Sequence, residues 1–148
     1  MSESGQTAQN AVVVGIDGSD GSRAALDYAL GEAARRGVGV RAIMAYAGPD
    51  VWSTAEGILP DARVLHDAAQ KEAATLVEAA VSAYPGTAPA VTTEIYMGPA
   101  STVLIEHSKG ASALVVGHRG RGGIASRLIG SVGLNAVVHA DCTVIVVR

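Results

Sequence analysis

Two apolar stretches, residues 11–16 and 113–116, constrain the fold most strongly because neither alternates polar with apolar side chains. A strand that is apolar at every position is typical of a parallel sheet covered by helices on both faces. Between these stretches, strand-like segments alternate with segments of helical spacing, an order that favours the α/β class. We therefore expect a parallel sheet with right-handed crossover connections.

The expected strands are residues 11–16, 38–46, 90–96, 112–116 and 143–147, and the expected helices are 22–36, 61–84, 99–109 and 130–140. Partial alternation in the third strand indicates a sheet edge. Pro99 is expected at the first helical position, where its missing N–H costs nothing. The predicted fold is a single-domain three-layer α/β/α sandwich whose five-stranded parallel sheet has the order 3-2-1-4-5.

Length and composition fit one compact domain at residues 11–148, preceded by a flexible tail at 1–10. The net charge of −3 and the 3% of aromatic residues argue against binding to nucleic acid. Cys142 is the only cysteine, so an internal disulfide and a cysteine-built metal site are excluded, and we expect a buried thiol in the last strand. No apolar run reaches the roughly 20 residues that cross a bilayer. Residues 1–10 lack the pattern of a secretory signal, so we expect a cytoplasmic protein without a membrane role.

The glycine-rich segment 117–131 is the strongest functional signal, because it links the fourth strand to the last helix. Glycine permits positive φ and close approach of backbone to a ligand. The N–H groups and dipole of a helix start favour an anion. Residues 108–140 contain no carboxylate but include Lys109, Arg119, Arg121 and Arg127. This combination predicts a cradle for nucleotide phosphates.

The first strand ends at Asp17 and the fourth ends at Gly117. In the order 3-2-1-4-5 these two strands are neighbours. Ligands of such sheets bind beyond the carboxyl ends of the strands where the strand order reverses. Asp17 and the glycine-rich segment are therefore expected to share one crevice. Two other interpretations stay open: the glycines serve only close packing, or Asp17 is only a turn or helix-capping residue.

Other nucleotide motifs fit less well. A Walker A loop requires Gly-Lys, which does not occur. Residues 120–125 match a relaxed dinucleotide fingerprint, but Asp141 precedes its strand and no second mononucleotide half follows.

The spacing Gly117-x2-Gly120-x9-Gly130-Ser131 resembles the nucleotide-binding motif of the universal stress protein family, in its ATP-binding branch. Residues 12–19, 98–100 and 142–147 also resemble the family's first strand and acidic turn, the start of its third helix and its closing strand. The resemblance covers the chain from residue 11 onward, apart from the loop at 47–60. It implies an adenine nucleotide alpha hydrolase-like fold.

The resemblance also implies an ATP site. Asp17 would contact a sugar hydroxyl or the base, and the backbone of Ala45 would meet the adenine edge. Gly15 and Ile16 would form the floor of the site. The ribose and the α-phosphate would lie against Gly117, His118, Arg119 and Gly120, and the segment continues with Arg121, Gly122 and Gly123, which are also assigned to the site. The β- and γ-phosphates would be bound by Gly130, Ser131 and Val132. No catalytic or metal-ligating residue is assigned.

The resemblance thus implies an ATP-binding universal stress protein, expected to hold magnesium with ATP. It would be a nucleotide-dependent regulator in the stress response with at most slow hydrolysis. One alternative is a nucleotide-independent dimeric scaffold; the last apolar strand, at an edge, would suit a homodimer in either case. Another is a member that binds AMP or cyclic AMP. Trp52, in the 47–60 loop, is interpreted as a hydrophobic plug, with a ligand contact as the alternative.

Overall fold

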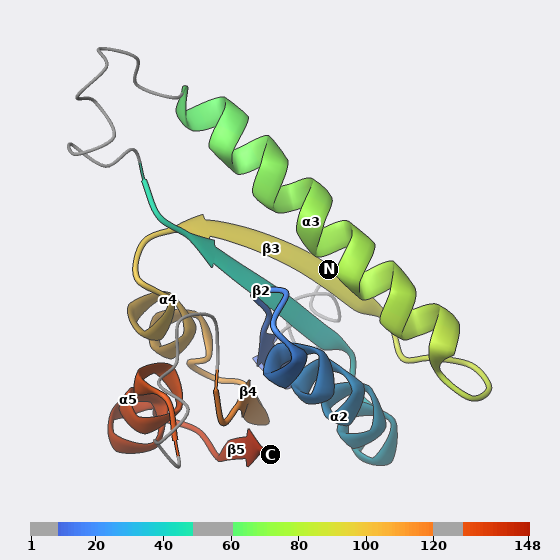
Figure 1. Cartoon of the computed structure of the whole chain (residues 1–148). Coiled ribbons are helices and arrows are strands. Elements are labelled where there is room, and N and C mark those ends of the chain that lie inside the picture. Colours follow the sequence, from blue (N-terminus) through green and yellow to red (C-terminus); the bar gives the residue numbers. More distant parts are fainter. Residues whose placement is uncertain (1–8, 49–60, 120–128) are drawn as a thin grey trace.

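Five parallel strands form one sheet at the centre of the protein (Figure 1). The computed structural model describes residues 9–48, 61–119 and 129–148. The strands are β1 (Val12–Gly15), β2 (Val40–Tyr46), β3 (Val91–Met97), β4 (Ala113–Gly117) and β5 (Val144–Val147). Their order is β3-β2-β1-β4-β5, which confirms the predicted topology and places β3 at an edge.

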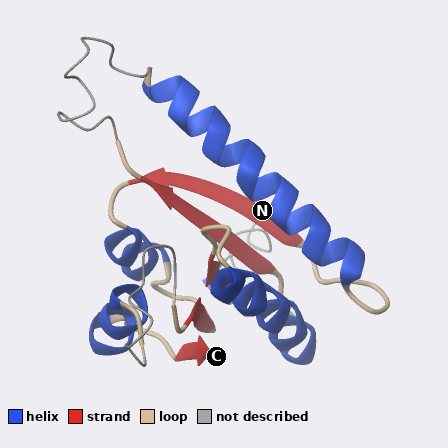
Figure 2. Ribbon diagram, viewed as in Figure 1, coloured by secondary structure: helices blue, strands red, loops and turns tan. Residues whose placement is uncertain are grey.

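Helices cover both faces of this sheet (Figure 2). On one face lie α2 (Asp20–Arg36) and α3 (Ala62–Ala83), and on the other lie α4 (Ala100–His107) and α5 (Ser131–His139). Val12 and Val14 join the core on the α2 and α3 side, whereas Val13 joins the core on the opposite side. The alternate side chains of β1 are therefore all buried, which explains its unbroken apolar sequence.

The inner face of α2 combines small residues with the large buried side chains of Leu26 and Leu30. Ala25, Ala29 and Ala33 recur every fourth position and are fully buried. Tyr28, in the same helix, is 41% exposed and lies under the guanidinium of Arg35. With no side chain longer than a methyl group at these three positions, the helix packs close to the sheet.

Several predicted boundaries were wrong by a few residues, for local reasons. Helix α2 starts at Asp20 rather than at residue 22, because Ser19 caps it. Pro99 is the N-cap of α4 rather than its first helical residue. The strand expected from residue 38 begins at Val40, after the left-handed C-cap Gly37 ends α2 with φ 66°.

Cys142 also differs from its predicted position. It precedes β5 instead of lying within it, and it is only partly buried, against the core between the sheet and α4 and α5. Among the described helices, none is both long enough and apolar enough to cross a membrane.

A polar cluster ties β2 and β3 to α4. Arg41 donates two hydrogen bonds to Glu94, of 2.6 and 2.8 Å, and a third of 2.9 Å to the backbone oxygen of His107. The Tyr96 hydroxyl donates to Glu94 at 2.7 Å, and its ring stacks on His107 with centroids 3.7 Å apart. The hydrogen bonds from Arg41 lower the pKa of Glu94 against the opposing effect of burial.

We expect Glu94→Gln to lower the free energy of unfolding near neutral pH by about 1–2 kcal/mol, because it removes a charge-assisted pair that is only partly shielded from solvent. A carboxyl whose pKa is lowered by folding stabilises the protein above its unfolded pKa. That contribution disappears as the pH falls from the usual value of 4.5 through the lowered native value. The difference between variant and wild type should therefore shrink as the pH falls below 4.5, as urea unfolding at several pH values can measure. Glu106→Gln, at the exposed pair with Lys109, is the control; an equal difference at every pH would contradict the prediction.

Candidate functional site

An open pocket of about 480 Å³ lies at the carboxyl ends of the strands, where β1 and β4 are neighbours and the strand order reverses. We call it the switch-point pocket. Its lining comes from β1, β2, β4, α2, α4, α5 and the turns that follow β1 and β4. The lining residues are Gly15, Ile16, Asp17, Ser22, Ile43, Ala45, Ala100, Leu104, Val116, Gly117, Arg119 and Val132.

The structure brings together part of the predicted site. The predicted residues that line the switch-point pocket are Gly15, Ile16, Asp17, Ala45, Gly117, Arg119 and Val132. His118, Gly130 and Ser131 flank this set in the chain but do not line the pocket. Gly120, Arg121, Gly122 and Gly123 lie outside the described residues, as do Arg127 and Trp52.

Sequence reasoning missed the apolar wall of the pocket. Ala100 and Leu104 lie four residues apart in α4 and so share one helix face. Ile43 stands two residues before Ala45 in β2, so both side chains point to the same face of the sheet. These spacings are visible in the sequence, but only the strand order shows that α4 and β2 meet at this pocket.

Close backbone packing explains Gly117. A Cβ on Gly117 would lie 2.7 Å from the backbone C and O atoms of Gly21 in the first turn of α2. A Cβ on Gly21 would in turn collide with the backbone oxygen of Arg119. Neither Gly117 nor Gly130 has a positive φ, so the conformational freedom of glycine is not used at these two positions. At Gly117, the packing interpretation of the glycine motif therefore has direct structural support.

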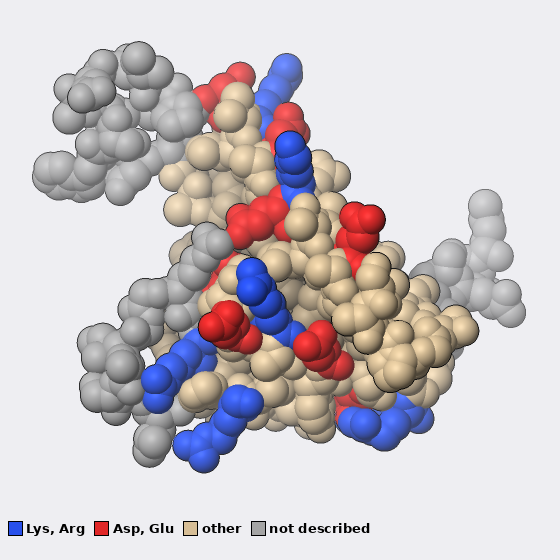
Figure 3. Space-filling view, turned by 45° about the vertical axis from the view of Figure 1, so that its right-hand side comes forward, with Lys and Arg blue, Asp and Glu red and all other residues tan. Residues whose placement is uncertain are grey.

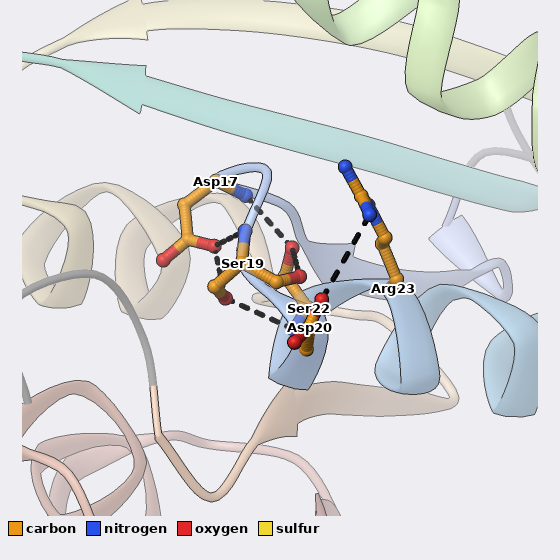
Figure 4. Close-up of polar contacts among 5 residues, drawn as sticks. All are labelled: Asp17, Ser19, Asp20, Ser22 and Arg23. Atoms are coloured by element: carbon orange, nitrogen blue, oxygen red, sulfur yellow. Dashed lines mark hydrogen bonds and ion pairs between the residues drawn. The ribbon is translucent and has the colours of Figure 1, made fainter.

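The turn between β1 and α2 is held by its own polar side chains (Figure 4). Asp17 accepts hydrogen bonds at Oδ1 from the backbone N–H of Ser19 at 2.9 Å and from its hydroxyl at 2.5 Å. The backbone N–H of Asp17 donates to Ser22 Oγ at 3.2 Å. Ser19, not Asp17, is the helix cap, and Asp17 both stabilises the turn and lines the pocket.

The start of α5 forms the opposite side of the site. Its N-cap, Gly130, is extended, with φ −75° and ψ 169°, and has no side chain with which to cap the helix. The Gly130 N–H donates to the backbone oxygen of His118. Val132, in the first turn, lines the switch-point pocket. An uncapped helix start beside a pocket suits an anion, because its first N–H groups have no intrahelical acceptor.

Two buried nitrogen atoms lie just after β4. Arg119 Nε and His118 Nδ1 have no hydrogen-bond partner within the described parts of the chain. A buried polar atom without a partner costs about 1–3 kcal/mol, so a ligand acceptor reaching Arg119 would recover that cost. Asp17 is the one carboxylate among the residues that line the pocket. The described residues contain no group of three or more His, Cys, Asp or Glu side chains placed to hold a metal ion.

Charges outside the pocket are mixed. On the face drawn in Figure 3, acidic and basic side chains are interspersed and no large patch of one sign forms. Arg35 and Arg36 pair with Glu32, and Arg23 lies 3.8 Å from Asp20.

A parallel sheet of order 3-2-1-4-5 with a pocket at its switch point defines a three-layer α/β domain of the doubly wound type. The model of the universal stress protein family matches residues 10–148. Universal stress protein Rv2623 of Mycobacterium tuberculosis is 36% identical over 140 residues, which cover 95% of this chain and 46% of that protein. The chain belongs to the universal stress protein family, and it spans about half the length of this relative.

Solved structures share this fold. Universal stress protein UspA from Lactobacillus plantarum matches with a TM-score of 0.72 and 24% identity, over 95% of this chain and 98% of that one. A universal stress protein in complex with cAMP matches with a TM-score of 0.65 and 31% identity, over 94% of this chain and 97% of that one.

Proposed function

We propose that the protein binds ATP in the switch-point pocket and acts as a nucleotide-dependent regulator in the stress response. The observation that carries this proposal is the buried, unpartnered Nε of Arg119 in a pocket that also borders the uncapped start of α5. A phosphate would supply acceptors to both. The relative described in complex with cAMP supports an adenine nucleotide as the ligand class.

The walls of the pocket suit the parts of such a nucleotide. Ile43 and Leu104 offer an apolar surface for the base, whose edge would meet the backbone of Ala45. Asp17 would accept a hydrogen bond from a sugar hydroxyl or from the base. The phosphates would lie towards Arg119 and the first turn of α5. The proposed site keeps the remaining predicted phosphate residues, which are His118, Gly120, Arg121, Gly122, Gly123, Gly130 and Ser131.

We favour ATP over AMP or cyclic AMP because the α5 start adds a second anion site beyond Arg119. Magnesium would be held mainly by phosphate oxygens and water, as is usual for this ion. Fast phosphoryl transfer needs an aligned base and metal-binding carboxylates. Since the lining of the pocket offers Asp17 alone, any hydrolysis of ATP is proposed to be slow.

We expect ATP at about 100 times its Kd to stabilise the folded protein by about 2.7 kcal/mol and so to raise Tm by several degrees. Asp17→Ala should weaken binding about tenfold, because it removes one charged acceptor. Calorimetric titration and thermal melting with ATP, AMP and cyclic AMP would rank the three ligands. Titration with 2′,3′-dideoxy-ATP, which lacks both of these sugar hydroxyls, separates the two roles of Asp17. If Asp17 contacts a sugar hydroxyl, wild type and Asp17→Ala should bind this analogue with equal affinity. If none of these nucleotides shifts Tm, the binding proposal fails and the scaffold alternative gains.

A homodimer through the C-terminal edge is part of the proposal. β5 pairs only with β4 among the described strands, so its outer edge can pair with a second copy. Beside it, α5 exposes Leu134, Val137 and Val138, which are 53%, 54% and 64% exposed. The molar mass from light scattering tests this assembly, and a monomeric mass at micromolar concentration would contradict it.

A further inference from the structure

Ser19 connects the cap of α2 to the carboxylate in the switch-point pocket. Its Oγ accepts from the backbone N–H of Ser22 at 3.2 Å, and its hydroxyl and backbone N–H both donate to Oδ1 of Asp17 (Figure 4). Ser19 itself does not line the pocket. One hydroxyl therefore serves a helix end and a candidate ligand-binding carboxylate together.

Capping alone does not require the hydrogen bond from the Ser19 hydroxyl to Asp17. A serine caps a helix by accepting from an N–H in the first turn, which Ser19 does towards Ser22. The donor bond to Asp17 adds nothing to that function. It places two donors on one carboxylate oxygen and so limits rotation of the carboxylate.

The backbone on both sides of Asp17 is also fixed. Its N–H donates to the Oγ of Ser22, which is only 5% exposed and donates in turn to the backbone oxygen of Ser19. Gly18, between Asp17 and Ser19, has φ +83°, a conformation that other residues rarely adopt. The side chain and backbone of Asp17 are thus both held before a ligand arrives.

We propose that Ser19 is a positioning residue for nucleotide binding: its hydroxyl orients the Asp17 carboxylate in the switch-point pocket. This inference rests on the proposed function of that pocket. A group held in its binding geometry loses less conformational freedom when the ligand binds, so the affinity is higher. Ser19 would act through Asp17, without touching the nucleotide.

The experiment measures ATP affinity by calorimetric titration for the full chain and its variants. Ser19→Ala should lower the affinity about five- to tenfold, less than the loss of a direct hydrogen bond to a charged group, because Asp17 and its bond from the Ser19 N–H remain. Ser19→Thr keeps a hydroxyl and a capping residue and should restore most of the affinity. Asp61→Ala is the matched control. It removes the N-cap of α3, which accepts from Arg63 N–H at 3.0 Å away from the pocket. It should lower Tm by about 3 °C, as loss of a cap does, with unchanged affinity.

A double-mutant cycle separates positioning from a purely structural role. If Ser19 acts through the carboxylate, Ser19→Ala should cause no further loss of affinity when Asp17 is already alanine. Equal losses from Ser19→Ala in both backgrounds would overturn the inference, as would unchanged affinity of the single variant. In either case the proposed function stands, provided that wild-type protein binds ATP. Absence of ATP binding by wild type would overturn both.

Discussion

Replacing Gly21 with alanine should destabilise the protein by about 3 kcal/mol, the upper part of the range for overpacking, although alanine ordinarily favours a helix over glycine by about 1 kcal/mol. The added Cβ would collide with the backbone oxygen of Arg119. A flexible side chain could rotate away, but a backbone oxygen can move only with its chain. The first turn of α2 and the end of β4 must therefore separate, and both contribute residues to the switch-point pocket. The affinity for ATP should therefore fall together with the free energy of unfolding.

Gly31→Ala is the matched control, because Gly31 lies in the same helix. Its added Cβ would meet only the Nη1 atom of Arg35, at 3.7 Å, which is an ordinary contact. This variant should stabilise the protein by up to about 1 kcal/mol. Urea unfolding of both variants measures the contrast. If Gly21→Ala proves as stable as Gly31→Ala, the close approach of α2 to Arg119 is wrong.

Gly130→Asp should change stability and binding in opposite directions. Gly130 is an extended N-cap without a side chain, and aspartate both adopts this conformation and caps helices well. A carboxylate at the start of α5 should stabilise the ligand-free protein by about 0.5–1 kcal/mol. It would occupy the N–H groups proposed to bind phosphate and would repel the anion. ATP affinity should therefore fall by about 100-fold or more, since like charges brought together cost several kcal/mol.

Asn135→Asp controls for the added charge. This exposed residue lies farther along α5 and introduces the same negative charge away from the helix start. Its ATP affinity should remain within about threefold of wild type, because an exposed charge is screened by water and salt. Thermal melting without ligand and calorimetric titration with ATP give the two readings for each variant. Undiminished ATP binding by Gly130→Asp would exclude the α5 start from the site.

The sequence predicted the fold well because its main features have local causes. β1 is apolar at consecutive positions because Val12, Val13 and Val14 face two different cores. The helical pattern that starts at residue 61 corresponds to α3, which Asp61 caps by accepting from Arg63 N–H. Prediction of the strand order required only that β1 and β4 be neighbours, which is the usual arrangement for a ligand site at a switch point.

The site was harder to predict because its packing joins segments far apart in the chain. Gly117 was singled out for conformational freedom, but it is glycine because Gly21, almost a hundred positions earlier, lies against it. Leu104 and Ile43 resembled ordinary core residues, since nothing local marks them as pocket walls. Ser19 lies in a turn that offers several possible N-caps, and its dual contact depends on side-chain geometry that spacing alone does not specify.

The row of alanines along α2 is expected to influence the shape of the switch-point pocket, although none of them lines it. Ala25, Ala29 and Ala33 are fully buried along α2, and Gly21, one turn before Ala25, lies close to the backbone of Arg119. A larger residue at Ala33 should push the C-terminal end of α2 away from the sheet. The helix would then tilt, and its first turn, which contains Gly21 and lies about three turns from Ala33, would shift. The shape of the switch-point pocket is thus expected to depend in part on alanines that do not line it.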